Sequence, residues 1–232
     1  MALLTETGLM ELHIFDDPVL MRLGPVPITE TMVTSAIVTV VLIGLGAVMG
    51  SRVRSGRSDL LSTLALMTVE SFDRLVEDIV GRRQTVVATI AATFFLFIAG
   101  CNLAGQLPGV HPATGSLATT SALAVLVFFS VPIAGIWSNG LWGYLKHYFR
   151  PNPLLMPLHV ISELSRTLAM SVRLFGNIMS GHLVVGLLVA LAGFLVPTPM
   201  MALDLLIGLL QAYIFAILST VYIGAAMSVG EE

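Results

Sequence analysis

A long stretch without charged side chains constrains the fold most: no Asp, Glu, Lys or Arg occurs between Gln84 and Leu145. Soluble domains carry about a quarter charged residues. This chain has 11% charged and 56% hydrophobic residues, with a mean hydropathy of +0.93. We therefore predict an all-α integral membrane protein whose core forms within lipid.

Five apolar stretches are long enough to form membrane-embedded helices. They cover about residues 30–49, 85–107, 118–145, 154–192 and 200–229. Gly193 and the Pro197-Thr198-Pro199 segment predict the turn between the last two. Residues 29–232 are thus expected to form a single membrane domain, preceded by an external N-terminal segment over residues 1–28.

The basic residues predict the orientation of the chain. They follow the first span, precede the second and follow the third: Arg52, Arg54, Arg57, Arg82, Arg83, Lys146 and Arg150. Lys and Arg in short loops mark the cytoplasmic side of a membrane. With five crossings, the N-terminus is predicted outside and the C-terminus in the cytoplasm.

Residues 58–83 have a different pattern. Apolar residues such as Leu64, Phe72 and Ile79 recur at helical spacing, while Glu70 and Asp73 lie mostly on the other side. Such an amphipathic helix is expected to lie in the membrane interface and not to cross it. The alternative is an ordinary soluble amphipathic helix within a loop.

The last two apolar stretches are longer than a membrane is thick. A helix over residues 154–192 would measure about 58 Å, whereas the hydrocarbon core is about 30 Å thick. We therefore expect a long tilted hairpin, unless residues 154–163 lie along the interface. An oblique hairpin of this kind can lie against a large curved partner.

Arg173 is the most unusual residue of the fourth stretch, since no charged residue occurs between Thr167 and Leu203 apart from it. A cation at the centre of a bilayer costs about 2.5–3.5 kcal/mol on insertion scales. Such a residue is expected to face protein, water or an ion path. A purely structural pairing with a carbonyl or carboxylate is the alternative.

Other polar residues share one helical face with Arg173 at spacings of three or four. These are His159, Glu163, Arg166, Met170, Asn177 and Ser180. His182 lies on the opposite side, and on the returning helix Asp204, Gln211 and Tyr222 share a face. An antiparallel hairpin can bring His182 close to Asp204, where the pair either exchanges protons or only fixes the register.

Three sequence elements carry a family resemblance. The first element is Ser171-Val172-Arg173-Leu174-Phe175-Gly176-Asn177, followed by Ser180-Gly181-His182. The second element is Leu210-Gln211-Ala212-Tyr213-Ile214-Phe215, followed by Val221-Tyr222-Ile223. The third and weaker element is Asn102-Leu103-Ala104-Gly105-Gln106-Leu107-Pro108. In order and spacing they resemble subunit a of F-type ATP synthases. The resemblance covers roughly residue 58 to the C-terminus.

The resemblance implies a stator ion channel in a bacterial inner membrane, with two offset half-channels that load and unload the carboxylates of a rotating c-subunit ring. The implied partners are that ring, the b subunits, the remaining ATP synthase subunits, lipid and protons. A sodium-translocating variant stays open. No cofactor, nucleic acid or independent catalysis is implied, and the chain has no nucleotide-binding loop.

The resemblance also assigns roles to residues. Arg173 is the essential cation facing the ring, and Asn177, His182, Asp204 and Gln211 belong to the outer half-channel. Many bacterial relatives have an acid at the position of His182 and a His at that of Asp204; here the pair is exchanged. His159 stands where relatives often have an acid, so Glu163, one turn later, is expected to take the acidic role. Glu163, His159 and Arg166 are assigned to the inner half-channel.

Two other classes of protein are alternatives to an ATP synthase subunit. In an intramembrane metal hydrolase, His159 and Glu163 would bind a metal, but His182 lies about 35 Å from His159 along the helix. A secondary transporter would usually show internal repeats or broken helices, and the sequence has no evident repeat.

Overall fold

The computed structural model describes residues 19–23, 26–55, 60–107, 110–149, 156–192 and 196–228. Its elements are β1 (Val19–Leu23), β2 (Val26–Thr29), α1 (Glu30–Arg54), α2 (Leu60–Val80), α3 (Thr85–Ala104), the short 3₁₀ helix η1 (Ala113–Gly115), α4 (Leu117–Phe149), α5 (Met156–Ala192) and α6 (Pro197–Ser228). Five of the helices are long and apolar enough to cross a membrane, which confirms the predicted fold class.

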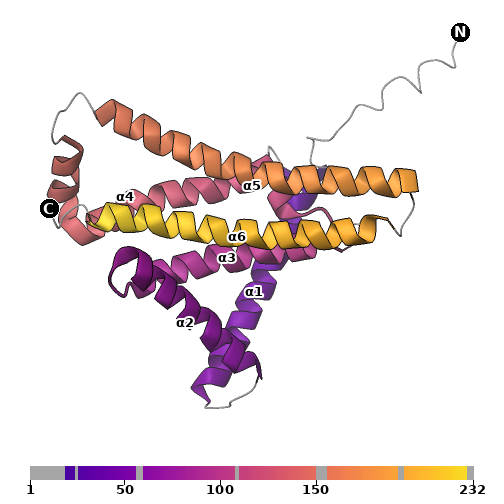
Figure 1. Cartoon of the computed structure of the whole chain (residues 1–232), viewed down its shortest axis with the longest axis horizontal. Helices are drawn as coiled ribbons and strands as arrows, with labels where there is room; N and C mark the ends of the chain where they lie inside the picture. The colour runs from indigo at the N-terminus through magenta and orange to yellow at the C-terminus, as the bar shows by residue number, and fades with distance from the viewer. Residues whose placement is uncertain are drawn as a thin grey trace, which may run out of the picture.

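Four helices, α3 to α6, run lengthwise beside one another, and α1 crosses this bundle at a steep angle (Figure 1). Helix α6 contacts α3, α4 and α5, so it lies at the centre of the packing. The core includes Phe94 of α3 and Phe215 of α6, whose rings meet edge to face with centroids 5.6 Å apart. Leu174 of α5 is fully buried in the same cluster.

The lengths of the helices fit an oblique bundle. Helix α1 has 25 residues and spans about 37 Å, which suits an upright crossing of the bilayer. Helix α5 has 37 residues and spans about 55 Å, well above the hydrocarbon thickness of about 30 Å. Because α5 and α6 run across the direction of α1 in Figure 1, the predicted tilted hairpin agrees with the arrangement of the helices.

Helix α2 has the predicted amphipathic character. Phe72 and Val76 are buried against the bundle, and the Phe72 ring lies 5.4 Å from that of Phe95 on α3. On the exposed side, Arg74 pairs with Glu70 at 2.7 Å. Gly81 ends the helix with φ of +77°, a left-handed conformation that glycine adopts without steric cost. Its location at the membrane surface stays a prediction.

Several boundaries differ from those expected. Helix α4 is interrupted at Gly140, where φ is +73°, so its apolar span ends near Ser138 and not at Leu145. Pro197 opens α6 and does not belong to the preceding turn, because proline is tolerated in the first turn of a helix. Gly193 lies outside the described residues.

A short antiparallel pairing of β1 and β2 precedes α1. No strand was predicted there, since residues 1–28 were assigned only as an external segment. Residues 1–18 lie outside the described residues, so the extent and location of this segment stay predictions.

Candidate functional site

Arg173 lies near the middle of α5 and its side chain is exposed on the surface of the bundle. Its exposed neighbours are apolar; Val172, for example, is 59% exposed. Among the residues that the structure describes, none forms a hydrogen bond or an ion pair with Arg173. A guanidinium is always protonated and needs an anion in low dielectric. Within the described part of the chain, Arg173 is therefore an exposed charge without an anionic partner.

A hydrogen bond joins the two arms of the hairpin one turn from Arg173. The side-chain amide of Asn177 on α5 donates to the side-chain oxygen of Gln211 on α6 at 2.9 Å. Gln211 is only 3% exposed, and buried polar groups in a membrane require such partners. Both residues were predicted from the sequence, and the structure brings them together.

His182 and Asp204 lie at the turn end of the hairpin, both half-buried. They are close enough to interact electrostatically, although no direct hydrogen bond joins them in the described structure. The Asp204 carboxylate rests against Gly181, where a Cβ atom would collide with it. Gln106, beyond the end of α3, donates a long hydrogen bond to Asp204 at 3.4 Å.

A buried polar link holds α3 against α6 one turn from Gln106. The Asn102 amide donates to the backbone carbonyl of Gly208 on α6 at 2.8 Å, and its oxygen accepts a hydrogen bond from Thr114 of η1 at 2.7 Å. Gly208 permits this approach, since a Cβ there would lie 2.9 Å from the Asn102 nitrogen. Asn102 thus fixes the part of α6 that carries Asp204.

A contact between a histidine and a carboxylate lies near the same end of the bundle. His111, in the segment between α3 and η1, lies 3.2 Å from the carboxylate of Glu30 at the start of α1. His111 also interacts electrostatically with His182. Neither Glu30 nor His111 was predicted as a site residue. Glu30 opens the first apolar span and His111 lies between the second and the third, but sequence spacing did not relate either of them to His182.

Toward the start of α5 the polar residues are more exposed. The Arg166 guanidinium lies 4.5 Å from the ring centroid of Tyr222 on α6, a cation–π contact that joins the hairpin arms a second time. Both His159 and Glu163 belong to α5; His159 is exposed and Glu163 is half-buried. Within the predicted stripe Met170 differs from the polar residues, because it is 3% exposed and packs in the core.

The contacts of the hairpin share one antiparallel register. Arg166 faces Tyr222, Asn177 faces Gln211, and Gly181 faces Asp204. Polar groups therefore line the hairpin toward both of its ends, and Arg173 lies between them. No three His, Cys, Asp or Glu side chains come together as a candidate metal site among the described residues.

A multi-span membrane bundle with a fixed, unpaired cation between two sets of polar groups belongs to the class of ion-translocating membrane subunits. Comparison with known proteins gives the family. The ATP synthase A chain family matches residues 32–224, and the chain belongs to this family, as the sequence resemblance implied. It is therefore an integral inner-membrane subunit of the membrane sector of an ATP synthase.

Individual relatives match almost the whole chain. The chain is 42% identical over 211 residues to ATP synthase subunit a 2 of a Bradyrhizobium species, covering 90% of this chain and 93% of the relative. It is 42% identical over 219 residues to ATP synthase subunit a 1 of Chlorobium luteolum, covering 94% and 98%. With ATP synthase subunit a 1 of Hahella chejuensis it shares 39% identity over 212 residues, covering 90% and 89%.

Proposed function

We propose that this chain guides ions to and from the carboxylates of a c-subunit ring through two offset half-channels separated by Arg173, and so couples ion flow to rotation of the ring. The unpaired, exposed guanidinium of Arg173 supports this proposal most directly. A carboxylate on each passing c subunit supplies the missing anion. Since an adjacent arginine favours the ionised form of a carboxylate, Arg173 promotes release of the bound ion.

The outer half-channel comprises His182, Asp204, Asn177 and Gln211. The geometry that supports this assignment is their succession along the hairpin, from the half-buried His182 and Asp204 to the Asn177–Gln211 hydrogen bond. Gln106 extends this set, since it donates to Asp204. Histidine and carboxylate groups can take up and pass on protons near neutral pH.

The inner half-channel comprises Glu163, His159 and Arg166 on the other half of α5. Glu163 takes the acidic role there. The contact of Arg166 with Tyr222 keeps this end of the hairpin closed on α6 while leaving a second positive charge beside the path. Two paths that end on opposite sides of Arg173 cannot join, because a fixed cation repels protons and metal ions between them.

The cycle follows from these positions. An ion arriving through the outer path neutralises a c-subunit carboxylate, which lowers the cost of moving that site into lipid. After rotation the site meets the inner path and Arg173, and the ion leaves. The basic residues Arg52, Arg54, Arg82 and Arg83 support a cytoplasmic location for the inner path, because Lys and Arg in short loops favour that side. The b subunits hold this chain still against the turning ring.

The proposal predicts ATP-driven ion uptake by the assembled complex. Purified ATP synthase containing this chain, reconstituted in vesicles, should acidify the lumen when ATP is added, as followed by a pH-sensitive dye. Protons are the expected ion, so acidification should persist in sodium-free buffer. Uptake that requires sodium would select the sodium variant, and an assembled complex that hydrolyses ATP without any uptake would contradict the proposal.

Exchange of His182 and Asp204 tests the outer half-channel. The single change His182→Asp places two carboxyl groups side by side, and Asp204→His places two imidazoles side by side. Either single change should slow ion uptake. Coupling between neighbouring residues typically reaches about 0.5–3 kcal/mol, or about 2- to 150-fold in rate. The double exchange should recover most of that loss. If it is no faster than the slower single variant, the two residues do not act as a unit.

A further inference from the structure

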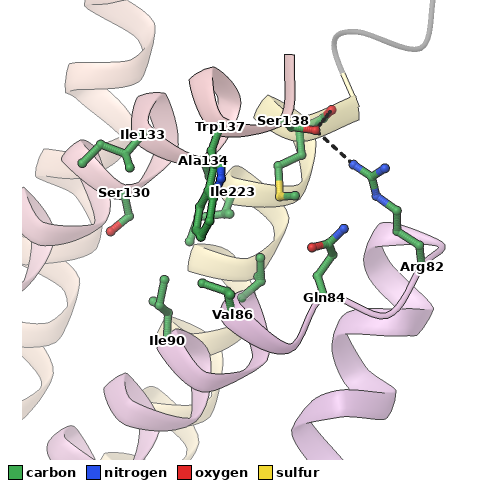
Figure 2. Close-up of a pocket in the computed structure, with 12 residues that line it drawn as sticks. Arg82, Gln84, Val86, Ile90, Ser130, Ile133, Ala134, Trp137, Ser138 and Ile223 are labelled. Carbon is green, nitrogen blue, oxygen red and sulfur yellow. Dashed lines mark hydrogen bonds between the residues drawn. The ribbon is translucent and has the colours of Figure 1, made fainter. Parts of the chain in front are cut away.

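The two ends of the bundle differ in the groups that they offer to a proton. Where α3 begins and α6 ends, a groove of about 410 Å³ is lined mostly by apolar side chains such as Val86, Ile133 and Trp137 (Figure 2). None of the described residues that line it takes up and releases protons near neutral pH, since Arg82, which donates to the Ser138 hydroxyl, stays protonated. At the opposite end, where α3 ends and α1 and α6 begin, ionisable side chains gather: Glu30, His111, His182 and Asp204.

His111 is exposed, yet the chain that carries it is firmly packed. Residues 112–114, which follow it directly, are buried. The short helix η1 contacts α1, α3, α4 and also α5, the helix that carries His182. The Thr114 hydroxyl of η1 donates to the side-chain oxygen of Asn102 on α3 at 2.7 Å. The imidazole of His111 therefore meets the surroundings of the bundle from a fixed support.

Glu30, in the first turn of α1, orients His111 from a distant part of the chain. The Nδ1 atom of His111 lies 3.2 Å from a carboxylate oxygen of Glu30, and the His111 side chain is 63% exposed whereas that of Glu30 is 26% exposed. Because Nδ1 faces the carboxylate, exchange of protons with water falls to Nε2, the other ring nitrogen. A carboxylate at the surface also raises the local concentration of cations.

The same connection also reaches the residues of the outer half-channel. His182 of α5 interacts electrostatically with His111 and with Asp204 of α6, and both His182 and Asp204 are half-buried. Gln106, at the other end of the connection, donates to Asp204 at 3.4 Å. The exposed His111 and the half-buried pair behind it thus form a succession of groups that leads from the surface into the hairpin.

We propose that His111 and Glu30 form the outer entrance of the outer half-channel, where His111 exchanges protons with external water. This inference rests on the proposed function of the chain. Nε2 of His111 takes a proton from a hydronium ion and forms an imidazolium, which then releases a proton to water beside His182 and becomes neutral again. Residues 105–116 contain no Lys or Arg, which favours the outer side of the membrane for this entrance.

The test measures ATP synthesis by the assembled complex in vesicles at a fixed membrane potential, with the predicted outer side facing the lumen. With the lumen at about pH 8, where protons are scarce and an ordinary histidine is mostly neutral, His111→Ala should slow synthesis about tenfold, the lower end of what a charged entrance adds to on-rates. With the lumen at about pH 6 the loss should be smaller, because more protons reach His182 unaided. Imidazole added to the alkaline lumen should restore much of the rate, since it carries protons as the missing side chain did.

Matched variants separate an entrance from a structural contact. Glu30→Gln should show a loss with the same pH dependence, whereas Glu70→Gln, which removes an exposed carboxylate of α2 that pairs with Arg74 at 2.7 Å, should leave the rate unchanged. An unchanged rate for assembled His111→Ala in the alkaline lumen would overturn the inference. So would a loss that is equal at both pH values and insensitive to imidazole, which would indicate a structural role.

The complex of unchanged sequence distinguishes failure of this inference from failure of the proposed function. If that complex makes no ATP under the same potential, the proposed function itself is contradicted. If it makes ATP only when sodium is present, the proposed function stands in its sodium form, but an entrance that passes protons through His111 is overturned.

Discussion

Vesicles that contain the assembled Arg173→Ala complex should show no ATP-driven ion uptake. The substitution removes the cation that favours the ionised form of each arriving c-subunit carboxylate, so the bound ion is not released. It also removes a group whose insertion costs about 2.5–3.5 kcal/mol, so assembly should not suffer. Dye-detected uptake, with subunit content measured on the same vesicles, checks both expectations.

Ser180→Ala is a suitable control for this experiment. Ser180 is an exposed polar residue of α5. Among the described residues its hydroxyl donates only to the Asn177 backbone carbonyl, at 3.1 Å, so its loss should leave uptake near that of the unchanged complex. Normal uptake by an assembled Arg173→Ala complex would refute the role of Arg173. Loss of uptake in both variants would show that α5 tolerates no change on this surface.

Gly181→Ala should slow uptake strongly, although it introduces the best helix-forming residue. The new Cβ atom would occupy the space of the Asp204 carboxylate, which must then shift and change its contact with Gln106. Displacing a functional group by about 1 Å can cost about 10²-fold in rate. Gly→Ala within a helix is otherwise stabilising by roughly 1 kcal/mol, so reduced folding of α5 would not explain the loss.

The matched change is Gly186→Ala on the same helix. A Cβ atom at Gly186 meets no other group within 4 Å, so this variant has the same gain in helix propensity without the collision. Uptake should stay close to that of the unchanged complex. If Gly181→Ala and Gly186→Ala pump equally well, the position of the Asp204 carboxylate does not limit ion entry.

The sequence was a good guide to which polar residues lie within the apolar helices. Arg173 was recognised because a lone cation within an apolar stretch is costly wherever the stretch packs. Asn177 and Gln211 followed from helical spacing on their own helices. Met170 has the same spacing, yet it is buried in the core. Periodicity identifies a face of a helix but does not say which part of that face meets another helix.

The residues missed by the sequence analysis act across segments far apart in the chain. Gln106 reaches Asp204, and His111 pairs with Glu30, across spacings that no helical period relates. The break of α4 at Gly140 was not predicted either, because an isolated glycine is tolerated within a helix. Only its φ of +73° in the structure reveals the break. Such contacts depend on crossing angles and on the conformation of the connections.

The sequence by itself determined the five apolar spans, the amphipathic α2 and the position of Arg173 near the middle of an apolar helix. Hydropathy and charge act residue by residue along a chain that must match a bilayer of fixed thickness. Only the tertiary structure decided the register of the hairpin, which sets Asp204 against Gly181, and the open exposure of Arg173. Helices in lipid associate through close packing and interhelical hydrogen bonds, and these depend on which side chains fit once the helices have met.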